Sequence, residues 1–199
     1  FGCAALLDAM ASYDEKDSTS TKRDNINFEK SLSKDFGSLN IGVIKNIEKL
    51  GISEDVINAY ETSKTVLTGL GHKLIEVDFS ELSSGICSYY VIAPAECSSN
   101  LSRFDGVKYG YRSEGEKDIA NLYMNTRSDG FGDEVKKRIL IGTHVLSAGF
   151  YDAYYLQAQK VRRMIKDKFE TFFEDVDLIF MPTTLDQAFE KNRKSDDPN

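Results

Sequence analysis

Cysteine and histidine are scarce in this 199-residue sequence, which contains three cysteines and two histidines. Cys3, Cys87 and Cys97 are odd in number and have no metal-ligand spacing, so we expect neither a disulfide-stapled fold nor a zinc site. Unpaired thiols are typical of a reducing compartment. We expect each cysteine to be a small buried residue, His72 to be a turn residue, and His144 to be a hydrogen-bonded core residue.

Long apolar runs and clusters of basic residues are also missing. No run approaches the roughly 20 apolar residues that cross a bilayer, so we predict no membrane insertion. The net charge is -7, and lysine and arginine are interspersed with acidic residues. This argues against a main role in clamping nucleic acid, although contact with RNA through a partner is not excluded. The sequence has no glycine-rich phosphate loop and no serine in nucleophile-elbow spacing.

Apolar runs on either side of a helical pattern predict an α/β fold with a parallel sheet. Asn40–Ile44 has the pattern of a buried strand, and Lys73–Phe79 alternates as a second strand. A helix is expected over Ser53–Leu70, with its serine as a good N-cap. Such a strand–helix–strand unit favours parallel strands joined by a crossover. A third short strand is predicted over Asp177–Met181.

Helical patterns dominate the sequence after Ser83. The predicted helices are Ile86–Leu101, Lys117–Arg127, Asp133–Leu146 and Tyr151–Glu174. Near the start, Phe1–Ser12 has helical spacing and leads into a polar loop at Tyr13–Asn27. We therefore divide the chain into a strand–helix–strand part (1–82), a helical excursion (83–176) and a strand with a truncated loop (177–199). The excursion is the part that we expect to wall off a binding site.

A loop rich in polar and aromatic residues follows the first of these helices. A helix that only buries an apolar stripe needs no such loop, so we interpret it as surrounding a ligand or a partner. Tyr111 is of most interest, because a tyrosine hydroxyl can orient a polar substrate without the cost of burying a charge. Alternatively, Arg103 and Asp105 form a structural bridge that closes the loop. The residues concerned are Asn100, Arg103, Asp105, Tyr109, Tyr111 and Arg112.

The long helix predicted over Tyr151–Glu174 carries an apolar and aromatic face followed by two arginines, Arg162 and Arg163. Adjacent helical residues point about 100° apart, so only one of the two arginines can border this face. An arginine on the buried side is costly unless it meets an anion, such as a ligand carboxylate. The alternative is that both arginines lie on a solvated face.

Four runs carry a resemblance to a known family: SSNLSRFDGVKYGYRS, SDGFGDEVKKRILIGT, SAGFYDAYYLQAQKVRRMI and DLIFMPTT. With KDSTS at Lys16–Ser20 and the IGVI strand, they resemble the A subunits of the glutamyl-tRNA(Gln)/aspartyl-tRNA(Asn) amidotransferases, within the amidase signature family. The resemblance covers essentially the whole chain. It implies an α/β amidase-signature fold with a mixed sheet and packed helices. Because the chain begins without methionine, inside an apolar helical pattern, we expect an internal fragment from the central to C-terminal part of that fold.

The resemblance also implies an activity. Members of the family hydrolyse glutamine with a Ser–cis-Ser–Lys triad, and the ammonia amidates Glu-tRNA(Gln) or Asp-tRNA(Asn) on a partner subunit. The triad is expected upstream of Phe1, so no catalytic residue is assigned here and the fragment is predicted to be inactive. A tyrosine and an arginine of the family hold the substrate amino acid. We assign these positions to Tyr111 and Arg162, with Tyr109 and Arg163 as alternatives.

The resemblance further implies a heterotrimer with other amidotransferase subunits. The present subunit is expected to need no cofactor and no metal, whereas ATP and Mg²⁺ are expected in the partner subunit. Glutamine is the implied substrate, and mischarged tRNA would be contacted mainly through a partner. The implied location is the bacterial cytoplasm, or an organelle in a eukaryote. Two alternatives are a stand-alone amidase of a small amide and a non-catalytic amidase-like scaffold.

Overall fold

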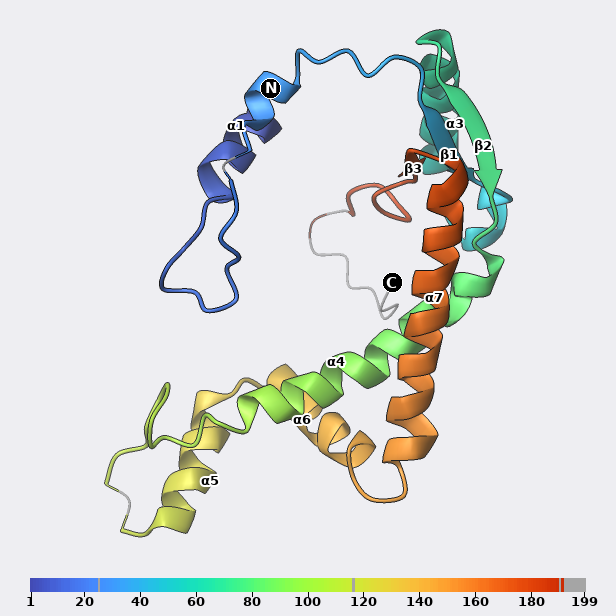
Figure 1. Cartoon of the computed structure of the whole chain (residues 1–199). Coiled ribbons are helices and arrows are strands. Elements are labelled where there is room, and N and C mark those ends of the chain that lie inside the picture. Colours follow the sequence, from blue (N-terminus) through green and yellow to red (C-terminus); the bar gives the residue numbers. More distant parts are fainter. Residues whose placement is uncertain (25, 116, 190, 192–199) are drawn as a thin grey trace.

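The computed structural model describes residues 1–24, 26–115, 117–189 and 191 (Figure 1). Its sheet has three parallel strands in the order β2-β1-β3, formed by β1 (Asn40–Ile44), β2 (Lys73–Val77) and β3 (Leu178–Phe180). In the register of the sheet, Ile41 lies opposite Leu74 on one side and Leu178 on the other. The predicted α/β fold with a parallel sheet is confirmed.

The apolar sequence of β1 makes it the centre of the core. Four of its five residues are buried, and helix α3 (Glu54–Gly69) packs against the same cluster. Between them lies a short 3-10 helix, η1 (Ile47–Leu50). Ser53 is the N-cap residue of α3 as predicted, but its side chain makes no capping hydrogen bond, and its buried hydroxyl has no partner among the described residues.

Tyr60 of α3 connects the ends of two neighbouring strands. Its hydroxyl accepts a hydrogen bond from the Ile44 backbone N–H at 2.9 Å and donates to the Phe180 carbonyl oxygen at 3.0 Å. Its ring stacks on Phe180 with the centroids 5.0 Å apart. Burial raises the pKa of the Tyr60 hydroxyl above its ordinary value. A single side chain thus satisfies polar groups of β1 and β3 at the carboxyl edge of the sheet.

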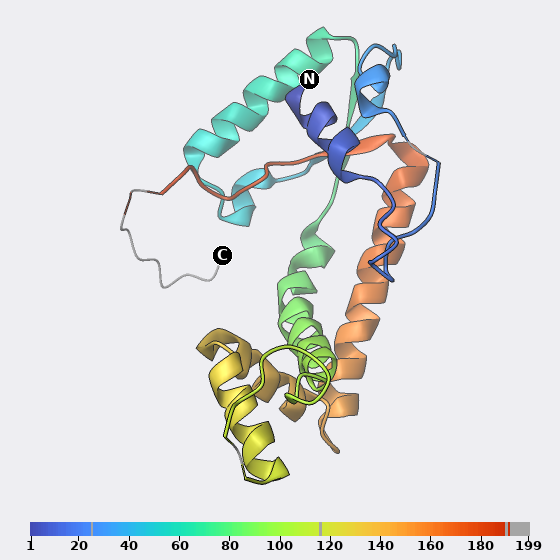
Figure 2. The ribbon, with the colours of Figure 1, turned by 90° about the vertical axis from the view of Figure 1, so that its left-hand side faces the viewer.

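The connection from β2 to β3 is the predicted helical excursion. It contains the 3-10 helix η2 (Ser80–Ser84), α4 (Gly85–Leu101), α5 (Ile119–Gly130), α6 (Asp133–Val145), a π-helical turn (Tyr151–Tyr155) and α7 (Leu156–Asp175). Helix α4 leads away from the sheet and α7 returns to it, and the two helices pack against each other (Figures 1 and 2). The predicted elements are present, with ends shifted by up to three residues.

The closest packing inside the excursion joins α4 to α6. Gly142 of α6 lies against the carbonyl group of Pro94 in α4, with no room for a β-carbon. One turn further along α4, the hydroxyl groups of Ser98 and Thr143 are 2.9 Å apart and share a hydrogen bond. Glycine at position 142 therefore allows the two helix backbones to touch.

The N-terminal segment forms α1 (Gly2–Met10) and a short helix, α2 (Phe28–Ser31), that was not predicted. The Asp8 carboxylate of α1 accepts hydrogen bonds from the backbone N–H groups of Phe28 and Glu29, at 2.7 and 3.1 Å. The carboxylate satisfies free donors at the start of α2, which explains why so short a helix forms here.

Several expectations about single residues are wrong. Cys3 and Cys87 are exposed rather than buried, and Cys97 is half-buried. His144 is also exposed, and its ring lies tilted against that of Phe150 with the centroids 4.2 Å apart. His72 directly follows the turn at 70–71, and its backbone N–H donates to the Leu67 carbonyl oxygen at 3.2 Å, which fits the prediction of a turn residue. Its Nδ1 also accepts a hydrogen bond from the Leu39 backbone N–H at 3.2 Å.

Strand β2 ends at Val77 rather than at Phe79. The apolar alternation continues to Phe79 because its ring packs on Phe169 and Phe172 of α7, and not because the strand continues. Of the predicted final unit at 177–199, residues 190 and 192–199 lie outside the described residues. Within the described part of the chain, no helix is long and apolar enough to span a membrane, and no group of side chains is suited to hold a metal ion.

Candidate functional site

The main candidate site is a groove of about 340 Å³ between α4 and α7, called here the Arg162 groove. Helical spacing explains its composition, since residues three and four apart share one helix face. One face of α4 supplies most of the wall, and α7 supplies Arg162 and Ile165. Apart from one acid and one base, the wall is apolar or uncharged. The α4 residues are Gly85, Ser88, Tyr89, Ile92, Ala93 and Glu96.

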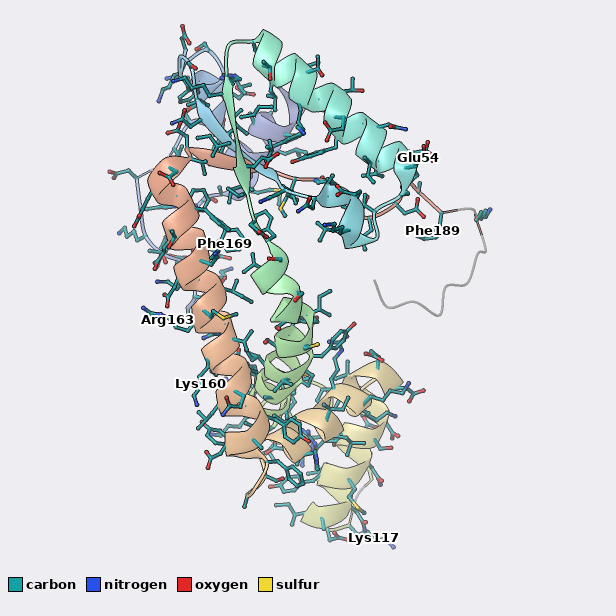
Figure 3. The ribbon with its side chains drawn as sticks, turned by 90° about the vertical axis from the view of Figure 1, so that its right-hand side faces the viewer. Glu54, Lys117, Lys160, Arg163, Phe169 and Phe189 are labelled. Atoms are coloured by element: carbon teal, nitrogen blue, oxygen red, sulfur yellow. The ribbon has the colours of Figure 1, made fainter. Side chains whose placement is uncertain are left out.

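The two adjacent arginines of α7 have different surroundings. Arg162 borders the groove, whereas Arg163 forms an exposed ion pair with Asp167, at 2.7 Å between Nε and the carboxylate. Figure 3 shows Arg163 on the side of α7 that faces away from α4. Both arginines are exposed, and Arg163 also lines a cavity, of about 440 Å³, on its own side of α7. Arg162 differs from Arg163 in lying on the α7 face that meets α4.

Tyr111 lies in a different place from Arg162. It borders a separate cavity of about 190 Å³, together with residues of the loop and of α5, and its ring touches Gly130. The alternative residue, Tyr109, is half-exposed beside Phe104, with ring centroids 6.1 Å apart. The structure does not bring Tyr111 and Arg162 into one cavity.

The loop that carries Tyr111 is held by a residue that the sequence interpretation missed. Arg127 of α5 donates from Nη1 to the carbonyl oxygens of Leu101 and Phe104, at 2.9 and 3.0 Å. Its guanidinium group also lies over the Phe131 ring, 5.0 Å from the centroid. Arg127 thereby caps the carboxyl end of α4. The sequence did indicate that Arg127 lies near the end of a predicted helix. It could not indicate which groups Arg127 binds, because these groups are distant in sequence.

The proposed bridge between Arg103 and Asp105 is not formed. Arg103 instead donates from Nε to the Asn100 carbonyl oxygen at 3.1 Å, and Asp105 accepts from the Val107 backbone N–H at 2.9 Å. Both side chains stabilise the turn locally. The loop is closed further along, where the Ser113 backbone N–H donates to the buried Thr126 hydroxyl at 3.0 Å.

A second cavity, of about 330 Å³, continues along α4 toward the π-helical turn. Tyr151 and Tyr155 of the π-helical turn form one side of it, with their ring centroids 5.2 Å apart. Single π-helical turns occur frequently at functional sites. Glu96 is the one residue that lines both this cavity and the Arg162 groove. Sequence interpretation did not single out Glu96, although its spacing from Ile92 and Asn100 places it on the same face of α4.

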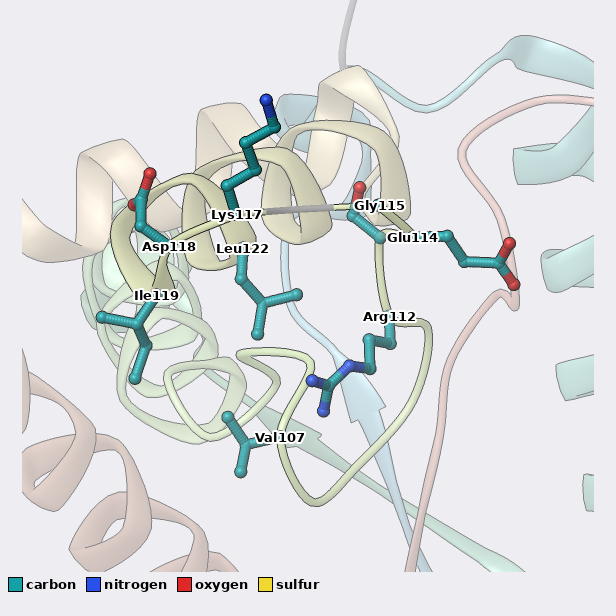
Figure 4. Close-up of a pocket in the computed structure, with 9 residues that line it drawn as sticks. Val107, Arg112, Glu114, Gly115, Lys117, Asp118, Ile119 and Leu122 are labelled. Atoms are coloured by element: carbon teal, nitrogen blue, oxygen red, sulfur yellow. The ribbon is translucent and has the colours of Figure 1, made fainter.

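A third cavity, of about 620 Å³, lies between the loop and the start of α5. Figure 4 shows the Arg112 side chain pointing between Val107 and Leu122, while the ends of Glu114 and Lys117 point away from the cavity. Arg112 already donates to the Gly106 carbonyl oxygen at 3.2 Å. Because its one inward cation is used to close the loop, this cavity is a poorer candidate than the Arg162 groove.

Comparison with known proteins identifies the class to which this fold belongs. The model of the Amidase family matches residues 2–199, so the chain belongs to the amidase family. It is 50% identical over 195 residues to the A subunit of the glutamyl-tRNA(Gln) amidotransferase of Nitrosomonas europaea, and 46% identical to that of Coxiella burnetii. Each alignment covers 98% of this chain and 40% of the relative. The chain thus spans well under half the length of these relatives.

Solved structures lead to the same conclusion about the fold. The crystal structure of the corresponding glutamyl-tRNA(Gln) amidotransferase A subunit from Thermotoga maritima superposes with a TM-score of 0.62 at 33% identity, over 94% of this chain and 35% of that chain. A 6-aminohexanoate cyclic dimer hydrolase superposes with a TM-score of 0.61 at 18% identity, over 92% of this chain and 35% of that chain. The second likeness concerns the fold alone. The predicted amidase-signature fold is confirmed.

Proposed function

We propose that this chain is the central to C-terminal part of the glutaminase subunit of a tRNA-dependent amidotransferase. The observation that carries the proposal is the 50% identity to the A subunit of a glutamyl-tRNA(Gln) amidotransferase over 98% of the chain. In this proposal the complete subunit hydrolyses glutamine to glutamate and ammonia. The ammonia is used on a partner subunit to convert Glu-tRNA(Gln) to Gln-tRNA(Gln), or Asp-tRNA(Asn) to Asn-tRNA(Asn).

The role of this chain is to bind and orient glutamine. The helical excursion over 83–176 forms the wall of the substrate site, and Arg162 binds the α-carboxylate of glutamine. A guanidinium group suits this task, because it can donate two parallel hydrogen bonds to a carboxylate. Ile92 and Ile165 form an apolar wall beside Arg162, whose side chain is exposed and so accessible to a ligand. Tyr111 is proposed as a second substrate contact, with its hydroxyl as donor and acceptor.

The covalent steps belong to residues outside this chain. A serine of the Ser–Ser–Lys triad attacks the side-chain amide carbon of glutamine, ammonia leaves, and water then releases glutamate from the acyl-enzyme. The glutaminase subunit needs no metal ion for these steps. ATP and Mg²⁺ serve the partner subunit, and the tRNA is held mainly there. We place the complex in the cytoplasm of a bacterium, or in an organelle of a eukaryote.

The test is an assay of the complete subunit together with the other subunits of the complex. We expect glutamate release from L-glutamine, and formation of Gln-tRNA(Gln) or Asn-tRNA(Asn) when ATP, Mg²⁺ and the mischarged tRNA are added. The isolated 199-residue chain, assayed in parallel, is expected to release no glutamate. Hydrolysis of small amides without any use of glutamine, and without co-purifying subunits, would instead establish a stand-alone amidase. A complete subunit that binds its partners but hydrolyses no amide would establish a scaffold.

A further inference from the structure

The end of α5 forms the surface on which the Tyr111 ring rests. We propose that Gly130, the last residue of α5, is a positioning residue for Tyr111. Because position 130 carries no side chain, the ring can lie in the orientation in which its hydroxyl meets the substrate. This inference rests on the proposed function, since it takes Tyr111 as a contact for glutamine. Gly130 itself touches no substrate in this proposal.

The local backbone gives no reason for a glycine at position 130. Gly130 belongs to a helix, and its φ lies outside the left-handed region that favours glycine. Alanine would be the better helix former there. Apart from the backbone of the helix itself, the three atoms nearest to an added β-carbon all belong to Tyr111. They are Cδ1 at 3.2 Å, Cβ at 3.6 Å and Cγ at 3.8 Å. The tyrosine therefore occupies the space that a side chain at position 130 would need.

The orientation of the Tyr111 side chain depends on this contact. The residue is 55% exposed, and within the described part of the chain its hydroxyl makes no hydrogen bond. The hydroxyl is thus available to a ligand, but none of the described polar groups holds it in place. What the ring packs on has to orient it instead, namely the end of α5 at Gly130 and the walls of the cavity of about 190 Å³ beside it.

The backbone that carries Tyr111 is tied to α5 on both sides. Before it, Arg127 donates from Nη1 to the Phe104 carbonyl oxygen at 3.0 Å, and after it, the Ser113 N–H donates to the Thr126 hydroxyl at 3.0 Å. Because the loop is fixed at both points, a larger residue at the end of α5 is expected to turn the ring rather than shift the loop. The contact requires a movement of a few tenths of an ångström. The hydroxyl lies farther from the backbone than the ring atom in contact, so it moves by more, and its hydrogen bonds weaken as their geometry departs from the ideal.

The experiment uses the complete subunit with its partner subunits and follows the hydrolysis of glutamine. For Gly130→Ala we expect kcat/KM to fall about threefold to fivefold, mainly through a higher KM, while kcat stays within about twofold. The fall should not exceed that of Tyr111→Phe, which removes the hydroxyl altogether. Stability in urea should equal or exceed that of wild type, because alanine favours the helix and the exposed ring is free to turn. A merely structural role for Gly130 would lower stability instead.

A double-mutant cycle tests whether Gly130 acts through Tyr111. In the Tyr111→Phe background, Gly130→Ala is expected to change kcat/KM by less than about 1.5-fold, because the hydroxyl that it would displace is already absent. Gly69→Ala is the matched control. Gly69 is the last residue of α3, and no atom lies within 4 Å of a β-carbon added there, so the kinetics should stay at the wild-type values.

Three results would overturn the role of Gly130: unchanged kinetics in Gly130→Ala, an equal fall in both Tyr111 backgrounds, or loss of the fold in Gly130→Ala while Gly69→Ala folds. Wild-type kinetics for Tyr111→Phe would remove the proposed second substrate contact and this inference with it, while the glutaminase function would stand. Failure of the wild-type complex to hydrolyse glutamine would overturn the proposed function itself.

Discussion

Gly142 of α6 lies directly against the carbonyl group of Pro94 in α4, and a β-carbon at Gly142 would overlap that carbonyl. Pro94 is itself buried inside α4, so the neighbouring backbone has little freedom to move aside. This contact fixes how closely α6 approaches the helix that forms most of the wall of the Arg162 groove. A larger residue at position 142 is therefore expected to change the stability of the protein.

Gly142→Ala is expected to destabilise the protein by about 1–3 kcal/mol or more, since the added carbon meets backbone rather than a movable side chain. Gly69→Ala is the matched control, because Gly69 is also helical and has no atom within 4 Å of an added β-carbon. There the gain in helix propensity should stabilise by about 0.5–1 kcal/mol. Urea denaturation of both variants measures the difference, and equal effects would contradict the proposed contact.

Tyr60→Phe is expected to cost about 1–3 kcal/mol, because it leaves the Ile44 N–H without its acceptor and the Phe180 carbonyl without its donor. The raised pKa of Tyr60 adds a dependence on pH. The folded state retains this proton more strongly than the unfolded state, so the contribution is complete below pH 10 and is lost as pH rises through the folded pKa. The advantage of wild type over Tyr60→Phe in urea should therefore shrink above pH 10. An advantage that grows there would contradict this assignment.

Arg162→Ala is expected to raise the KM for glutamine at least tenfold in the complete complex, which corresponds to about 1.4 kcal/mol. Arg163→Ala removes an equal charge but only an exposed ion pair with Asp167, so its KM should change less than about twofold. Steady-state glutaminase kinetics of the two variants, with matched far-ultraviolet circular dichroism, provide the measurement. The reverse order of effects would move the substrate contact to Arg163.

Tyr111→Phe tests the proposed second contact with substrate. Loss of a hydroxyl that binds glutamine should lower kcat/KM by roughly 5- to 10-fold, in line with one hydrogen bond of about 1 kcal/mol. Tyr109→Phe, on the same loop, is the control and should be close to neutral. Equal kinetics for wild type and Tyr111→Phe would limit Tyr111 to packing against Gly130.

The elements that the sequence predicted well are those with a strong local pattern. The NIGVI strand is continuous and apolar, and it forms the buried centre of the sheet. Helix α6 begins at Asp133 as predicted, with two acidic residues in its first turn. Helix geometry allowed only one of Arg162 and Arg163 to border the apolar face. In the structure Arg162 lines the groove against α4 and Arg163 pairs with Asp167, although both side chains are exposed.

Features that depend on partners distant in sequence could not be predicted in this way. Helix α2 forms because Asp8, about twenty residues earlier, binds its first N–H groups. Arg127 binds carbonyl groups at the end of α4 and in the loop that follows, more than twenty residues away. Likewise, nothing in the local pattern placed Tyr111 and Arg162 in separate cavities, because their relative position depends on how α5 and α7 pack on α4.

The π-helical turn at Tyr151–Tyr155 has a consequence for how the chain tolerates changes in length. Its wider turn is closed by a hydrogen bond from the Leu156 N–H to the Tyr151 carbonyl oxygen, five residues back instead of four. A π-helical turn holds about one residue more than an α-helical turn, so deleting one residue there would leave one complete α-helical turn and keep the segments on both sides nearly in phase. Tyr151 and Tyr155 would then be three residues apart, which still places them on one face. The loss of a single residue should therefore be tolerated better in this turn than inside α7, where it would turn one half of the helix by about 100° relative to the other.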